Sequence, residues 1–453
     1  MTEDRPAAQA DTPSTRASTV DLGFTSSVLV VVLAATFPVV QLVKTVVDRA
    51  TTVRDLSGAV HFVSEGRTAP LLEFGAAGLA ATAAVHLVVR SLRGDTFTVT
   101  NWALLAFFVL LAEVLRGRSE PSTLLYAVLT LLVVLAAGVA RLEAPAMGRV
   151  GAVAGLTALS VAVFTLVDPT RGWATCRPDK CTAAGGLLRG YFPQENVLGM
   201  YLATLLPTVA FIDRPVLRRA TLVLVTTTIL LTGSRTGAVV TLAALWSYAI
   251  VRRRATRAHH GDAGKVVGAV PLITFLVSGA LVFTLPDMSL TGRGLIYRLI
   301  REAWSDQKLL GPGRETLYDA YYSSMANWYL AHEHGQGAYV LGQVGLVGAV
   351  LFLLALGGIL RACWASRGPL PAIFALAPAL GFLTEPIWEI SLRSPYFVSL
   401  FLTVVLVSRS LHRDARGEHS LGGAPALRPA SPRPSSTASA ARARVTLPLP
   451  RGP

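Results

Sequence analysis

Long apolar segments separated by short polar connections are the feature that most constrains how this chain folds. A helix of about 20 apolar residues crosses a hydrocarbon core of roughly 30 Å. Of the 453 residues, 52% are hydrophobic and 15% are charged, whereas a soluble domain carries about 25% charged residues. The net charge of +14 is spread between the apolar runs. This pattern argues against a cytosolic enzyme, a nucleic-acid-binding protein and a secreted disulfide scaffold, and it predicts an all-α polytopic membrane protein.

Twelve stretches have, or nearly have, the length of a membrane-spanning helix. Two of them adjoin around Gly233, Ser234 and Arg235, so this pair can also be read as one broken helix. The first apolar run is long enough to remain as an anchor, and we expect no cleavable signal peptide. The predicted spans are residues 24–43, 70–89, 99–115, 122–140, 149–167, 196–212, 219–233, 236–251, 266–285, 338–360, 369–384 and 395–409.

The spans define an integral membrane domain over residues 23–411, flanked by two tails. Residues 1–22 are largely polar and form the N-terminal tail. Residues 412–453 are rich in Pro, Ser, Ala and Arg, a composition that cannot bury enough apolar surface to fold. We therefore predict a disordered C-terminal tail.

The distribution of Lys and Arg predicts the orientation of the chain. Connections on the two sides hold equal numbers of basic residues, but on one side these are packed into short loops. Short, basic loops are typical of the cytoplasmic side. Both termini are then cytoplasmic, and the loop 286–337, between the ninth and tenth spans, is extracytoplasmic.

The three cysteines agree with this orientation. Cys176 and Cys181 share the connection 168–195, which lies outside the cytoplasm, whereas Cys363 lies in an inner connection. Disulfides form in oxidising compartments. The pair could close a small disulfide loop, and the alternative is two free surface cysteines.

The loop 286–337, about 50 residues long, is far longer than a typical connection. Over residues 294–306, apolar side chains recur at helical spacing opposite a polar face that includes Arg298 and Glu302. This spacing predicts an amphipathic helix lying on the membrane surface. Long loops that carry His, Arg and aromatic residues are often functional.

Arg235, Arg293 and His334 are the candidate functional residues of the predicted outer face. An arginine near hydrocarbon is costly unless it faces protein, water or an anion. Its planar, forked donors suit phosphate oxygens, and histidine titrates near neutral pH. Each arginine could instead cap a helix or extend towards lipid headgroups, and the histidine could belong to a solvated loop. A metal site at His332 and His334 lacks a clear third ligand.

Five short motifs occur in order along residues 185–350. They are Arg189 with residues 190–196, Ser234-Arg235-Thr236-Gly237, Thr291-Gly292-Arg293, Leu309-Leu310-Gly311-Pro312-Gly313, and His334 followed by Gly345 and Gly348. Together they resemble the motifs of the O-antigen ligase and polymerase superfamily of bacterial membrane glycosyltransferases. The histidine motif departs from the family, which prefers Asn, Ser or Gln where this chain has Gly335, and His332 is therefore an alternative to His334.

The resemblance implies a ligase-like core over residues 185–360 that moves a glycan from an undecaprenyl-diphosphate carrier to an acceptor hydroxyl. The partners would be this lipid-linked donor, a glycan, lipid or protein acceptor, and membrane lipids. The reaction would be inverting and would need neither a metal nor a cofactor. Arg235 and Arg293 would hold the diphosphate and His334 would take the proton; Arg189, Asn196 and His332 would help bind substrate. The competing hypothesis is a transporter of an anionic solute or lipid, although the sequence shows no inverted repeat.

Overall fold

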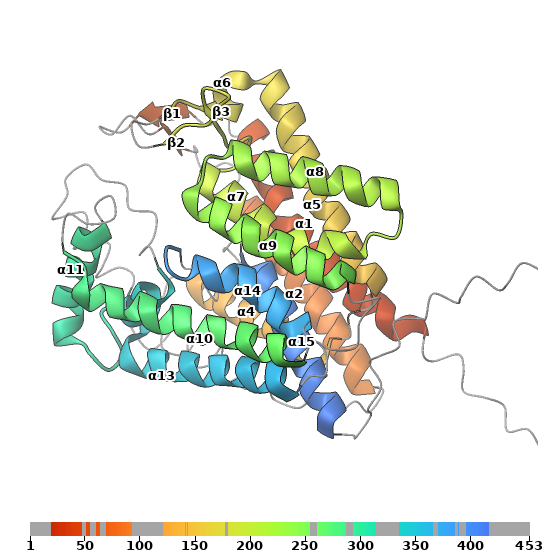
Figure 1. The fold of residues 1–453 in the computed structure, drawn as a ribbon, viewed down its shortest axis with the longest axis vertical. Coiled ribbons are helices and arrows are strands. Elements are labelled where there is room, and N and C mark those ends of the chain that lie inside the picture. Colours follow the sequence, from red (N-terminus) through yellow and green to blue (C-terminus); the bar gives the residue numbers. More distant parts are fainter. Residues whose placement is uncertain are drawn as a thin grey trace, which may run out of the picture.

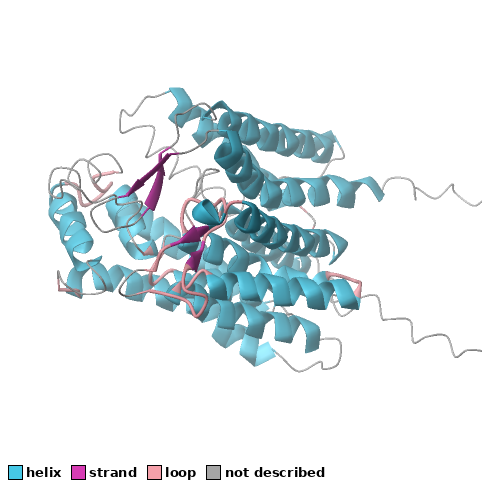
Figure 2. Cartoon of the chain, turned by 90° about the horizontal axis from the view of Figure 1, so that it is seen from above, coloured by secondary structure: helices cyan, strands magenta, loops and turns pink. Residues whose placement is uncertain are grey.

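The computed structural model describes helices joined by short connections and by two small antiparallel strand pairs. Figure 1 shows the arrangement of these elements, and Figure 2 shows the same chain from above. The structure describes residues 20–47, 51–54, 60–63, 69–92, 121–140, 142, 144–176, 180–253, 261–286, 293–313, 335–365, 370–385, 388 and 396–415.

The elements follow the apolar segments of the sequence closely. Pro121 and Pro215 each stand at the first position of a helix, where the missing N–H costs nothing. The helices are α1 (Val20–Val47), α2 (Ala69–Leu92), α4 (Pro121–Val139), α5 (Ala144–Val167), α6 (Pro169–Gly172), α7 (Glu195–Leu205), the 3₁₀ helix η2 (Leu206–Phe211), α8 (Pro215–Leu231), α9 (Arg235–Arg253), α10 (Gly261–Thr284), α11 (Arg293–Asp306), α13 (Gln336–Ala365), α14 (Leu370–Gly381) and α15 (Phe397–Ala415).

The predominantly helical architecture predicted from the sequence is confirmed. Every predicted span overlaps a helix except 99–115, which lies outside the described residues. Four described helices are long and apolar enough to cross a membrane: Ser26–Val47, Ala144–Val167, Val266–Thr284 and Gln336–Trp364, with mean hydropathies of 2.2–2.3. These helices indicate a membrane protein. The total of twelve spans, the orientation and the two tails, of which residues 1–19 and 416–453 are not described, stay predictions.

Two short strand pairs were not predicted. Strands β1 (Thr51–Arg54) and β2 (Val60–Val63) pair antiparallel, with Thr51 opposite Val63. Strands β3 (Trp173–Ala174) and β4 (Leu187–Leu188) also pair antiparallel. Both pairs lie in connections between helices, towards the end of the bundle where α11 lies (Figures 1 and 2).

The helices pack into one continuous core of apolar side chains. Helix α10 contacts α13 and α14, α9 contacts α14 and η2, and α5 contacts α1, α8 and η2. Small residues allow the closest approach: a Cβ on Gly151 would lie 2.9 Å from the carbonyl oxygen of Thr208 in η2. This packing fixes the ends of α7, α9 and α13, which carry the predicted motifs.

Candidate functional site

The turn between α8 and α9 presents Arg235 at the start of a helix. Gly233 has φ of +62°, a conformation open mainly to glycine. Ser234 then caps α9, because its Oγ accepts a hydrogen bond of 3.0 Å from the amide of Gly237. The cap explains why α9 begins at Arg235, whose side chain is exposed. The chain therefore forms two helices here, and Ser234 is the residue that caps α9.

Both motif arginines stand at the N-terminal end of a helix. Arg235 is the first residue of α9, and Arg293 is the first residue of α11. The N-terminus of a helix carries a partial positive charge, so a cation there does not stabilise the helix. Backbone N–H groups and guanidinium together favour an anion instead. The side chain of Arg293 lies outside the described residues.

Hydrogen bonds connect the α8–α9 turn to the start of α13. The hydroxyl of Thr384, in the segment after α14, donates to Thr236 Oγ1 at 2.9 Å. Two residues earlier, the carbonyl of Phe382 accepts the amide of Gln336 at 2.9 Å. The Gln336 side chain is fully buried; its Oε1 accepts from the amide of Trp388 at 2.9 Å, and its Nε2 donates to the carbonyl of Trp388 at 3.2 Å. The segment 382–385 therefore joins the neighbour of Arg235 to the first residue of α13.

Position 335 lies against α10 and α11. Gly335 has φ of +133°, and a Cβ on it would lie 3.0 Å from Ser278 Oγ and 3.1 Å from Tyr297 Oη. Tyr297 is one helical turn beyond Arg293 in α11. Gly335 therefore lies beside the Tyr297 hydroxyl of α11 and the Phe382 carbonyl, and Thr384, two residues after Phe382, bonds the neighbour of Arg235. His332 and His334 themselves lie outside the described residues.

The Gly-x-Gly segment and the glycines after the histidine contact each other directly. Gly345 breaks α13 with φ of +65°, and a Cβ on it would overlap the amide nitrogen of Gly311. Backbone hydrogen bonds join the two segments on either side of this contact: Leu346 to the carbonyl of Lys308 at 2.9 Å, Val347 to Leu309 at 3.0 Å and Gly313 to Gly342 at 3.1 Å. The structure therefore brings together two motifs that lie some 30 residues apart in sequence.

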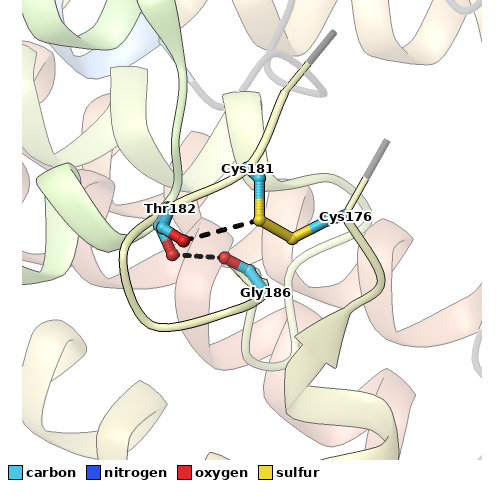
Figure 3. The surroundings of a disulfide bond; sticks show 4 residues. All are labelled: Cys176, Cys181, Thr182 and Gly186. Carbon is cyan, nitrogen blue, oxygen red and sulfur yellow. Dashed lines mark hydrogen bonds between the residues drawn. A yellow bond between two sulfur atoms is a disulfide. The ribbon is translucent and has the colours of Figure 1, made fainter. Parts of the chain in front are cut away.

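A disulfide closes the connection between α5 and α7. Cys176 and Cys181 are bonded, as the hypothesis of a small disulfide loop predicted, and Figure 3 shows the bond beside Thr182 and Gly186. The hydroxyl of Thr182 donates to the carbonyl of Gly186 and closes the following turn. The alternative of two free cysteines is wrong.

Lys180, next to this disulfide, binds the first turn of α7. Its Nζ donates to Glu195 Oε1 at 2.9 Å and to Asn196 Oδ1 at 2.8 Å. Only 8% of the Lys180 side chain and 12% of the Glu195 side chain are exposed. Asn196, predicted to help bind substrate, is thus held by Lys180 at the N-terminus of α7.

Arg189 is a second buried cation in this connection, with 2% of its surface exposed. Its Nε donates to the carbonyl of Arg171 at 2.8 Å. Burial lowers the pKa of the Arg189 guanidinium, and the charge of Glu195 partly opposes this shift. A guanidinium stays charged at neutral pH, and Glu195 places negative charge close to both Arg189 and Lys180.

The amphipathic helix predicted over 294–306 is confirmed as α11, but its apolar face is covered by protein. Ile296, Leu299 and Ile300 are buried, because α11 packs against α10 and α13. Arg301, expected on the polar face, is half-buried and donates to the carbonyl of Val282 in α10. The interpretation that these apolar residues face the membrane surface is wrong. The apolar face of a helix can pack against lipid or against protein, and the periodicity of the sequence does not identify which of the two it contacts.

The sequence analysis missed several buried polar residues of this region. These residues make the contacts described above or lie next to them: Lys180, Thr384, Ser278 and Glu385. Glu385 is 2% exposed. Two signals were present in the sequence: Lys180 precedes a cysteine, and Glu385 follows an apolar span. Among the described residues, no group of three or more His, Cys, Asp or Glu could hold a metal ion.

Comparisons of the chain with protein-family models, with curated proteins and with solved structures give no match.

Proposed function

We propose that this protein is a membrane glycosyltransferase that moves a glycan from an undecaprenyl-diphosphate carrier to an acceptor hydroxyl at the outer face of the cytoplasmic membrane. It would act as a cell-surface polysaccharide ligase or polymerase. The observation that carries the proposal is the chain of contacts from Thr236 through Thr384 and Phe382 to Gln336 and Gly335. This chain brings the segment beside Arg235 and the segment beside His334 to the same end of the bundle.

The charge distribution supports an anionic substrate. Arg235 and Arg293 begin their helices, so the helix dipoles add to the positive potential that they create. Arg189 and Lys180, both close to Glu195, add further positive charge to this region. A lipid diphosphate carries concentrated negative charge, and forked guanidinium donors match its oxygens.

In the proposed reaction, the acceptor hydroxyl attacks the anomeric carbon of the donor glycan. The new bond forms between the acceptor oxygen and this carbon while the bond from the carbon to the diphosphate oxygen breaks. The hydroxyl proton passes to a neutral His334, with His332 as the alternative base. Arg235 and Arg293 stabilise the charge that develops on the leaving diphosphate. Attack opposite the leaving group inverts the anomeric centre.

The Cys176–Cys181 bond supports an extracytoplasmic location for this end of the bundle, because disulfides persist in oxidising compartments. Lys180 lies beside this bond and beside α7 and the α8–α9 turn, so the disulfide and the proposed donor site share one side of the membrane. The N-terminal ends of α7, α9 and α13 then face outward, which agrees with the orientation predicted from the basic loops.

The experiment that tests this function is lipid and glycan analysis of a deletion strain complemented with variants. We expect the deletion to accumulate lipid-diphosphate oligosaccharide and to lack the finished polymer or conjugate. The wild-type gene should restore the product and His334→Ala should not, because the proton of the acceptor would have no base.

His332→Ala tests the alternative base, and His260→Ala, in a connection predicted to be cytoplasmic, is the matched control that should restore the product. Membrane levels of each variant would be compared by immunoblot. Product formation by His334→Ala at normal protein levels would remove this residue from the mechanism. A deletion strain with no change in lipid-linked glycan but impaired uptake or export of an anionic solute would favour the transporter.

A further inference from the structure

Lys180 connects three segments that lie apart in the sequence. Its covalent neighbour Cys181 is bonded to Cys176, its Nζ binds Glu195 and Asn196 at the start of α7, and its side chain reaches the α8–α9 turn. A Cβ placed on Gly233 would lie 3.6 Å from Lys180 Cε. No other described lysine makes such a connection between α7 and this turn.

The disulfide-closed connection packs tightly on the turn. A Cβ on Gly233 would lie 2.6 Å from Leu187 Cδ2 and 3.1 Å from Thr182 Cγ2. On the α7 side, a Cβ on Gly199 would lie 2.8 Å from Thr232 Oγ1. Any movement of this connection or of the first turn of α7 is therefore transmitted to the residues immediately before Arg235.

The pairing of Lys180 with Glu195 is close and shielded from water. A buried ammonium is costly without a partner, and breaking such a pair leaves an uncompensated charge. Glu195 also faces Arg189, so loss of Lys180 would change the balance of charge around the carboxylate. The first turn of α7 would then be free to shift towards Arg189.

We propose that Lys180 is a positioning residue of the donor site: held in place by the Cys176–Cys181 bond, it ties the first turn of α7 to the α8–α9 turn and so fixes the position from which Arg235 reaches the lipid diphosphate. This inference rests on the function proposed above. Lys180 acts through Arg235 and Asn196, and it needs no contact with the substrate.

The disulfide has a specific part in this arrangement. It joins two residues five positions apart, and Lys180 lies within the loop that it closes, immediately before Cys181. A covalent loop of this length restricts the backbone of Lys180 more strongly than the non-covalent contacts of an exposed connection do. Reduction of the bond should therefore impair use of the donor in the same way as loss of the lysine.

The kinetic test uses purified full-length protein with a lipid-diphosphate glycan donor. Lys180→Met should raise the KM for the donor about tenfold or more, because small misplacements of a binding group weaken its contacts strongly, while the KM for the acceptor stays unchanged. The conservative variant Lys180→Arg, which keeps a cation opposite Glu195, should keep the donor KM within about threefold of the wild-type value. Lys308→Met, an exposed lysine, is the matched control. An unchanged donor KM in Lys180→Met, or equal losses for donor and acceptor, would overturn the proposal.

A second measurement needs no variant and no transfer activity. In the wild-type protein, an amine-reactive ester should label Lys308 readily and Lys180 several times less, as read by mass spectrometry. Reduction of the disulfide should raise labelling of Lys180 alone. Equal labelling of Lys180 before and after reduction would refute the role of the disulfide.

The two proposals fail in different ways. If the wild-type protein transfers no glycan, the proposed function fails, and farnesyl diphosphate then serves as the probe of the anion site in a thermal-shift assay. Weaker binding of this probe by Lys180→Met than by Lys308→Met would support the positioning role without transfer. Equal binding by these two variants would overturn it.

Discussion

At the residue scale, the candidate site places cations at helix positions where a positive charge does not stabilise the helix. Arg235 and Arg293 stand at helix N-termini, where carboxylates are the stabilising residues. Arg189 is almost fully buried, and its Nε donates to the carbonyl of Arg171. We propose that the two arginines at helix N-termini are retained for an anionic ligand, here a diphosphate.

Arginine geometry gives a prediction for Arg235. Arg235→Lys should lower kcat/KM for the donor by about ten- to hundredfold, because an ammonium is a point charge and cannot replace two parallel donors to a phosphate. Transfer from a lipid-diphosphate donor by detergent-purified protein measures this effect.

Arg298→Lys is the control for Arg235→Lys. Arg298 is exposed on α11 and pairs with Glu302 one turn away at 3.7 Å, an interaction of the kind that contributes little at a surface. This variant should keep wild-type kinetics. Wild-type kinetics in Arg235→Lys as well would favour the interpretation that Arg235 extends towards lipid headgroups.

At the scale of the elements, the break in α13 is what allows the segment 308–313 to approach. Taken as a whole, α13 has the length and apolarity of a span, and the interruption is confined to Gly345. Backbone groups freed by the break are bonded by the segment that carries Gly311. Irregular backbone within a membrane helix needs partners of this kind.

Two glycines of the same helix provide a matched test of this contact. Gly345→Ala should destabilise the protein by about 2–4 kcal/mol, because alanine strains at positive φ and its methyl group would overlap Gly311. Gly357→Ala, where a Cβ meets nothing within 4 Å, should be neutral or stabilising by up to about 1 kcal/mol. Thermal unfolding in detergent measures both, and equal unfolding temperatures for the two variants would contradict the assigned contact.

At the scale of the whole molecule, the proposed site gathers at one end of a helical bundle. The connection with the disulfide, the first turns of α7 and α9, helix α11 and the start of α13 are joined there by contacts. Each of the four helices begins within its motif or shortly after the first residue of that motif. One side of the membrane then holds all of the proposed chemistry.

The proposed orientation predicts which cysteines a reagent outside the cell can reach. In intact cells, an impermeant thiol reagent should label Cys176 and Cys181 only after reduction, because the disulfide lies outside. Cys363, buried in α13, should stay unlabelled. Mass spectrometry of the purified protein gives the labelled positions, and labelling of the pair only after cell lysis would reverse the orientation.

The sequence by itself determined the helical character, the positions of most helices and α11, because apolar periodicity is a local property. The five-residue spacing offered the Cys176–Cys181 bond as one of two alternatives. It also singled out Arg189, Asn196 and Arg235, whose roles stay predictions. Tertiary structure decided that α11 packs on protein, that Gly311 meets Gly345, and that Lys180 joins α7 to the α8–α9 turn. These contacts join segments distant along the chain, and an apolar stripe or a single lysine does not specify its partner until the helices have packed.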